Sequence, residues 1–141
     1  MGTFGSEQIR DEVLLAARIL LAALFFRFGL SKLLDYSGTV AFMSHDGLPV
    51  PQLAALIAIV MEFFGSIAII LGVFTRPLAI LFVLYTLATA LTGHHFWTMT
   101  GADRMGAMIN FYKNLSIMGG FLLLYVQGAG RYSIDARSRL P

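Results

Sequence analysis

Four long apolar stretches divide the sequence, and the segments between them carry most of its charged residues. We expect membrane-spanning helices at residues 13–34, 51–72, 77–93 and 107–126. A helix needs about 20 residues, at about 1.5 Å each, to cross roughly 30 Å of hydrocarbon, and these runs approach or reach that length. Continuous apolar runs are not the alternating pattern of barrel strands. The pattern therefore predicts an all-α fold, a four-helix antiparallel transmembrane bundle.

The second stretch contains a single charged residue, Glu62, near its middle. A carboxylate at that depth costs about 2.5–3.5 kcal/mol or more, so it should face other helices and contact a basic residue. We expect Lys32 or Lys113 to be that residue. The helical period places mostly small side chains on the same face as this carboxylate. They are Ala55, Ala58, Gly65, Ser66 and Ile69.

Two interpretations of Glu62 follow from its position. It forms a structural ion pair that locks the second helix to a neighbour, or it is a protonatable group at the floor of a ligand pocket. The sequence does not separate the two.

Composition supports the membrane assignment. Hydrophobic residues make up 57% of the chain and charged residues 13%, against about 45–50% and about 25% in soluble domains. The chain has no cysteine, which excludes disulfides, iron–sulfur clusters and thiolate zinc sites within it. A net charge of +2 gives no indication of nucleic-acid binding. No cleavable signal peptide is evident.

We divide the chain into three parts. Residues 1–12 form a polar segment that we expect at the interface or disordered, residues 13–126 form the transmembrane domain, and residues 127–141 form a basic tail. We expect a short turn at 72–77 and long loops at 35–50 and 93–107. Phe42, Met43 and Leu48 indicate that the first loop dips onto the membrane or packs over the bundle.

The distribution of basic residues predicts the orientation. The N-terminus, the 72–77 turn and the C-terminus share one side of the bundle, and the two long loops share the other. Basic residues favour the cytoplasmic side, so both termini should be cytoplasmic. Arg104 is on the loop side, and five arginines are on the terminal side: Arg10, Arg76, Arg131, Arg137 and Arg139.

This topology brings polar residues together in the outer half of the bundle. The expected cluster, either ligand-binding or structural, is Lys32, Glu62, His94, Lys113 and Asn114, supported by Tyr85, Trp97 and Arg18. Arg18 lies apart from the others, in the cytoplasmic half. Adjacent helical residues point about 100° apart, so only one of His94 and His95 should enter the bundle. We expect no metal site, because the other oxygen and nitrogen ligands lie on loops without a recognised spacing.

Several segments resemble DoxX-family membrane proteins. They are AARILLAALFFRFGLSKLLDYSGTVAFMSHDGLPVP, MEFFGSIAIILGVFTRPLA, HHFWTM and FYKNLSIMGGFLLL. The resemblance implies a multi-pass protein of the bacterial inner membrane, linked to quinol oxidase, thiosulfate:quinone oxidoreductase or oxidative stress. The residues that match the family pattern are Arg18, Lys32, Glu62, His94 or His95, Lys113 and Asn114. Arg27 departs from it, because an apolar residue is usual there.

These observations lead to one main functional hypothesis. The protein is associated with respiratory or oxidative-stress redox chemistry and binds a quinone-like small molecule in the outer half of the bundle. The chain has no heme, flavin or metal signature, so electron transfer would use the bound quinone or a partner redox protein. The expected aromatic walls are Phe25, Phe28, Phe96, Trp97, Phe111 and Tyr112.

Two alternatives stay open at this point. The first is a non-enzymatic assembly or chaperone-like subunit that contacts another membrane protein through its small-residue faces. The second is a small transporter, which ranks last because the sequence has no inverted repeat and no plainly broken helix. A homo-oligomer is compatible with either function, and the lipid bilayer is a partner in all of them. The sequence leaves open whether the protein is an enzyme.

Overall fold

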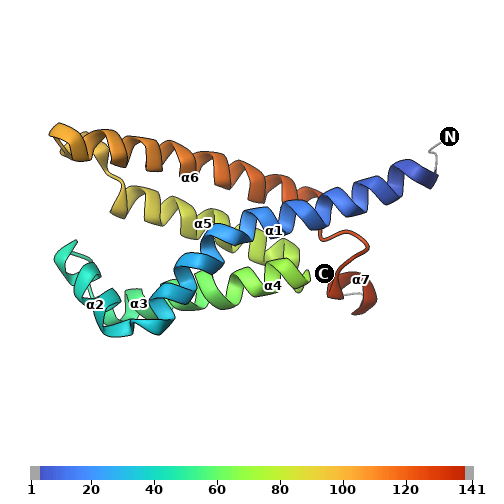
Figure 1. Ribbon diagram of the computed structural model, residues 1–141, viewed down its shortest axis with the longest axis horizontal. Helices are drawn as coiled ribbons and strands as arrows, with labels where there is room; N and C mark the ends of the chain where they lie inside the picture. Colours follow the sequence, from blue (N-terminus) through green and yellow to red (C-terminus); the bar gives the residue numbers. More distant parts are fainter. Residues whose placement is uncertain (1–3, 139–141) are drawn as a thin grey trace.

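The computed structural model describes residues 4–138 as a helical bundle (Figure 1). Within that range, four helical spans are long and apolar enough to cross a membrane. The first is α1 (Phe4–Leu34), and the second joins α3 (Pro51–Ile59), the π-helix η1 (Val60–Gly65) and α4 (Ser66–Leu71). The others are α5 (Thr75–Gly93) and α6 (Gly101–Gln127). The predicted all-α transmembrane bundle is confirmed.

Several helices extend beyond the predicted boundaries. The polar segment at residues 1–12 is helical from Phe4 onward, α5 starts at Thr75, and α6 starts at Gly101 instead of residue 107. Hydropathy locates the part of a helix that suits lipid, whereas backbone hydrogen bonding continues into the polar flanks. Residues 1–3 and 139–141, including Arg139, lie outside the described part of the chain.

The predicted long loops contain helical turns of their own. Residues 35–50 include α2 (Tyr36–His45), and residues 93–107 include the 3₁₀ turn η2 (Phe96–Thr98). The expectation of a loop at 35–50 is wrong because Asp35 caps a new helix there. Its Oδ1 accepts a hydrogen bond from Gly38 N at 3.0 Å, which satisfies a free N–H of the first turn.

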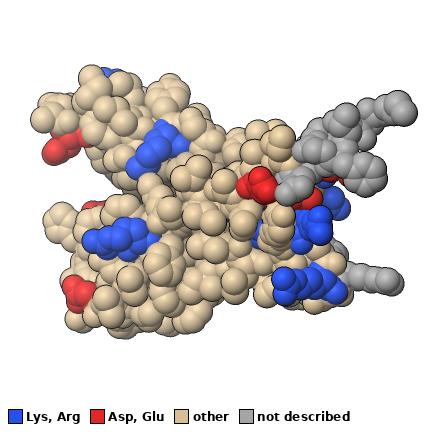
Figure 2. Space-filling model, turned by 45° about the vertical axis from the view of Figure 1, so that its right-hand side comes forward, with Lys and Arg blue, Asp and Glu red and all other residues tan. Residues whose placement is uncertain are grey.

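The bundle consists of two helix pairs that diverge. One pair is α5 with α6, and the other is α1 with the α3–η1–α4 span. Both termini lie at one end, which we call the terminus end, and α2 and η2 lie at the opposite, loop end (Figure 1). The two pairs separate toward the loop end, and Figure 2 shows a notch between two lobes there. The assignment of the terminus end to the cytoplasm stays a prediction.

Three phenylalanines join the two pairs in the middle of the bundle. Phe82 of α5 and Phe121 of α6 stack with ring centroids 4.7 Å apart, and Phe25 of α1 meets Phe82 edge-on at 4.9 Å. All three rings are buried. This aromatic contact holds the two pairs together at the centre, whereas toward the loop end they diverge.

The second span buries the face that the sequence predicts. Glu62 and the mostly small residues of its face are all buried: Ala55, Ala58, Gly65, Ser66 and Ile69. The π-helical turn η1 surrounds Glu62, and Gly29 of α1 packs directly against its backbone. A Cβ at Gly29 would clash with the backbone nitrogen of Phe63. The absent side chain therefore lets α1 approach η1 closely.

The terminus end is closed by the C-terminal segment. Arg18 is fully buried there, with Nη1 donating to Ile70 O at 3.2 Å and Nη2 donating to Tyr132 O. The tail contains α7 (Ile134–Ser138), and Asp135 accepts hydrogen bonds from Phe74 N at 2.7 Å and Thr75 N at 2.9 Å. The tail is therefore docked against the bundle in the part of it that the structure describes.

Candidate functional site: a polar cavity at the loop end

A cavity of about 420 Å³ lies between the two helix pairs at the loop end. It is bounded by side chains from α1, α2, η1, α5 and α6, together with the residue after α5. We call it the polar cavity. Its lining residues are Leu24, Phe25, Phe28, Lys32, Phe42, Glu62, Tyr85, Thr89, His94, Asn110, Lys113 and Asn114. All five residues of the predicted polar cluster, and Tyr85, are among them.

Glu62 is the centre of the hydrogen-bond network in this cavity. Lys32 Nζ donates to Oε2 at 2.6 Å, and Tyr85 OH donates to Oε1 at 2.6 Å. The Glu62 side chain is only 10% exposed, whereas that of Lys32 is 26% exposed. Both carboxylate oxygens thus have a donor, and a carboxylate buried at this depth is stable only with such partners. The expected basic partner is present, and it is Lys32.

The π-helical turn places this carboxylate. A π-helical turn adds a residue to the helical repeat and often occurs at functional sites. Ser66 Oγ donates to Phe63 O at 2.8 Å, which adds a hydrogen bond within the turn. The close approach at Gly29 brings α1 against the same turn, so Lys32, one helical turn further along α1, reaches the Glu62 side chain.

The α6 side of the cavity carries a second polar group of residues. Lys113 does not pair with Glu62; its Nζ donates to Asn110 Oδ1 at 2.9 Å. Asn114 is buried, with Nδ2 at 3.4 Å from Thr89 Oγ1 on α5. The cavity therefore has a carboxylate network on one wall and an ammonium group with amides on the facing wall.

The two adjacent histidines have different positions. His94 lines the polar cavity, whereas His95 lies outside it, with Nδ1 at 2.6 Å from Thr98 Oγ1. Helix α5 ends at Gly93, and the chain then turns into η2, so the two imidazoles lie on different sides of the chain at the end of the helix. This selects His94 as the histidine that faces the bundle.

The aromatic walls differ from those expected. Phe25 and Phe28 line the cavity as predicted, and Phe42 of α2 joins them. The remaining four predicted wall residues pack on one another along η2 and α6, outside the cavity: Phe96, Trp97, Phe111 and Tyr112. They contact one another, and none of them lines the cavity. The prediction that they form walls is wrong.

Some site residues could not be assigned from the sequence alone. Arg18, expected as a supporting residue, lies at the terminus end and does not line the cavity. Phe42 and Asn110 do line it and were not predicted to do so. Asn110 lies one helical turn before Asn114 on α6, and that spacing was a usable signal. For Phe42 the sequence indicated only that its segment dips onto the membrane or packs over the bundle, because its contact with the cavity depends on where α2 folds.

The arrangement can hydrogen-bond a small ligand at two facing walls. Lys32, Lys113 and His94 offer donors, Glu62 offers a proton acceptor, and phenylalanine rings offer flat apolar contact. Within residues 4–138, no three His, Asp or Glu side chains come together as metal ligands would.

A family model described as DoxX matches residues 13–95 of the chain. The chain belongs to the DoxX family. It is similar to the Escherichia coli protein "Inner membrane protein YphA", with 54% identity over 129 residues, which cover 91% of each chain. "Inner membrane protein YqjF" of the same organism is 38% identical over 129 residues, covering 92% of this chain and 94% of its own.

A more distant relative is the Bacillus subtilis protein "Putative oxidoreductase CatD". It is 31% identical over 78 residues, which cover 55% of this chain and 57% of its own. No solved structure matches the chain. Together with the four membrane spans, the family and the two Escherichia coli relatives identify a multi-pass inner-membrane protein.

Proposed function

We propose that this DoxX-family protein binds a quinone-like small molecule in the polar cavity, as part of redox chemistry at the inner membrane. The observation that carries the proposal is the buried Glu62 carboxylate, held by Lys32 and Tyr85 at the wall of a cavity with aromatic sides. A structural ion pair needs no cavity beside it. A ligand site does, and a pocket with a few convergent polar groups is its usual sign.

The cavity suits a flat ring with polar ends. Its volume of about 420 Å³ lies within the roughly 300–1,000 Å³ typical of small-molecule sites. Phe25, Phe28 and Phe42 supply apolar faces for the ring. Lys113 on one side and Lys32 on the other would donate to the two ring oxygens of a quinone, in addition to their hydrogen bonds to Asn110 and Glu62.

The redox part of the proposal rests on the family. The Bacillus subtilis relative carries the word oxidoreductase in its name. In this chain, Glu62 would accept a proton from a hydroxyl group of the reduced ligand, and Tyr85 would hold the carboxylate in place. The second proton of the oxidised quinol would leave to water at the loop end, and its two electrons would pass to a partner redox protein.

Quinone binding to purified protein in lipid nanodiscs tests the proposal. We expect Lys32→Met, Glu62→Gln, His94→Ala and Lys113→Met each to weaken binding, by about tenfold where a charged hydrogen bond is lost. The matched controls are His95→Ala and Trp97→Ala, since both residues lie outside the polar cavity. If the wild type binds no quinone, or if all four cavity variants bind as well as it does, the proposal is wrong.

A non-enzymatic assembly subunit is the second candidate function. It is favoured by Arg27, which is exposed on α1 within a membrane span and has no partner in residues 4–138. A charged side chain in lipid is costly, and a partner chain would cover it. A photo-crosslinking residue at position 27 tests this: we expect a specific protein adduct in cells, and labelling of lipid alone would contradict it.

A further inference from the structure

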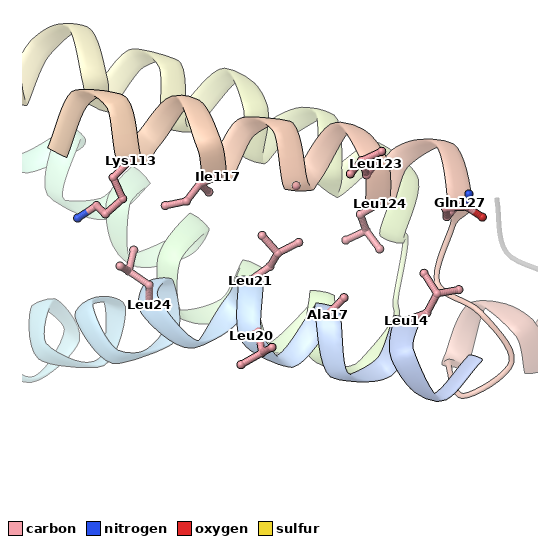
Figure 3. Close-up of a pocket in the computed structure, with 11 residues that line it drawn as sticks. Leu14, Ala17, Leu20, Leu21, Leu24, Lys113, Ile117, Leu123, Leu124 and Gln127 are labelled. Carbon is pink, nitrogen blue, oxygen red and sulfur yellow. The ribbon is translucent and has the colours of Figure 1, made fainter. Parts of the chain in front are cut away.

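An apolar groove of about 520 Å³ runs between α1 and α6. We call it the α1–α6 groove. Figure 3 shows leucines of both helices facing one another across it, with Lys113 at one end and Leu14 and Gln127 at the other. Ala17 and Gly120 also line it. These two positions carry little or no side chain, and Leu21 lies against Gly120 across the groove.

The groove and the polar cavity lie next to each other and share two lining residues. Leu24 of α1 and Lys113 of α6 line both of them. From this shared boundary the groove follows α1 back to Leu14, a length of about 15 Å at about 1.5 Å per residue. Side by side, the two spaces give a polar compartment at the loop end and a long apolar compartment that leads away from it.

This shape indicates a ligand with two chemically different parts. A ring with polar ends fits the cavity, and only an apolar chain fits between the leucines of the groove. Lipid tails could fill any gap between membrane helices, because association in lipid has no hydrophobic driving force. What distinguishes this groove is that it begins at the wall of the polar cavity, where Lys113 meets both compartments.

We propose that the α1–α6 groove holds the apolar tail of the same ligand whose ring lies in the polar cavity. The inference rests on the proposed function and makes it more specific. The ligand class is then a membrane quinone with a single long prenyl-type tail, and a tail-less quinone would occupy only the cavity. The tail leaves the ring beside Leu24 and Lys113 and runs toward Leu14 and Gln127.

Two pairs of neighbouring residues allow a matched test. Gly120→Leu and Ala17→Leu each put a larger side chain into the groove. At Gly120 the atom nearest to an added Cβ is Leu21 Cδ2, at 2.7 Å, and this end of a flexible side chain can shift to make room. Their controls are Gly119→Leu and Ala16→Leu, at exposed positions that do not line the groove. If one of the two groove variants fails to fold, the other groove variant and its control still test the inference.

The experiment compares two quinones with the same ring, one without a tail and one with a long prenyl tail, in identical nanodiscs. Partition of the tailed quinone into lipid is the same for every variant, so a difference between variants reports the groove. We expect Gly120→Leu and Ala17→Leu to lose about tenfold in affinity for the tailed quinone, equivalent to about 1.4 kcal/mol of lost packing contacts. Their affinity for the tail-less quinone, and both affinities of the control variants, should stay at the wild-type value.

The outcomes separate this inference from the proposed function. If the tail-less quinone binds and the groove variants leave the tailed quinone unaffected, the groove inference alone is overturned. It is also overturned if the groove variants weaken both quinones equally, or if they release bound phospholipid without changing quinone affinity. If the wild type binds neither quinone, the proposed function is wrong, and so is this inference, which rests on it.

Discussion

Lys32 and Glu62 stand 30 positions apart in the sequence, yet Lys32 Nζ donates to Glu62 Oε2 at 2.6 Å between α1 and η1. Tyr85 of α5 donates to the other carboxylate oxygen. One carboxylate therefore connects three of the four spans at the loop end, where the two helix pairs diverge. Its loss should affect both the stability of the bundle and any ligand in the polar cavity.

Replacing Glu62 should destabilise the protein according to what replaces it. Glu62→Ala leaves Lys32 and the Tyr85 hydroxyl without an acceptor, and we expect a loss of about 3 kcal/mol in the free energy of unfolding. Glu62→Gln keeps an acceptor oxygen and should cost less. Thermal unfolding in detergent, monitored by the loss of the helical circular dichroism signal, ranks the variants by stability.

The partner of Glu62 can be verified by a double-mutant cycle. Lys32→Met should be destabilising alone, and Lys32→Met combined with Glu62→Leu should cost less than the sum of the two single changes. Lys113→Met is the control, because Lys113 contacts Asn110 instead, and its effect should add independently to that of Glu62→Leu. Additivity at Lys32 would contradict the pairing.

Two glycine-to-alanine substitutions should have opposite effects. At Gly29 a Cβ would clash with the backbone of η1, so Gly29→Ala should force α1 away from it and lower stability by about 1–3 kcal/mol. At Gly119 a Cβ meets nothing within 4 Å, so Gly119→Ala should raise stability by about 1 kcal/mol through helix propensity. Equal effects on thermal unfolding would contradict the close contact between α1 and η1.

Asp135 should stabilise the start of α5 from the C-terminal tail. Its carboxylate accepts from the backbone N–H groups of Phe74 and Thr75. Removing a carboxylate that caps a helix costs about 1–2 kcal/mol, so Asp135→Ala should lower the unfolding temperature. The neighbouring exposed Arg137 provides the control, and Arg137→Ala should leave the unfolding temperature unchanged. Hydrogen exchange at Phe74 and Thr75 should increase only in the Asp135 variant.

The predicted orientation, with both termini cytoplasmic, determines which positions we expect to be reached from outside. The chain has no cysteine, so Ser44→Cys, Thr100→Cys and Ser138→Cys each carry one thiol. All three positions are exposed, the first two at the loop end and the third at the terminus end. On intact spheroplasts, an impermeant thiol reagent should label the first two variants and not the third. Labelling of the third alone would reverse the orientation.

The sequence by itself determined the four spans and the inward face of the second one. Both follow from the free-energy cost of exposing polar groups to lipid, which does not depend on tertiary detail. Backbone polar groups in lipid must be paired within a helix, and an uncompensated carboxylate must turn away from lipid. For the same reason, the sequence required a basic partner for Glu62. It also brought Lys32, Glu62, His94, Lys113 and Asn114 to one half of the bundle, since topology fixes which helix ends are neighbours.

Only the tertiary structure decided which lysine pairs with Glu62 and what surrounds the pair. Lys32 and Lys113 are equally suitable in sequence, and the choice depends on how α1 and α6 rotate and cross, which the Gly29 contact with η1 sets. The placement of α2, which brings Phe42 to the cavity, and the α1–α6 groove also depend on distances between helices. Periodicity gives each helix a face, but the distance and angle between two helices arise from packing of particular side chains, and no local pattern in the chain records them.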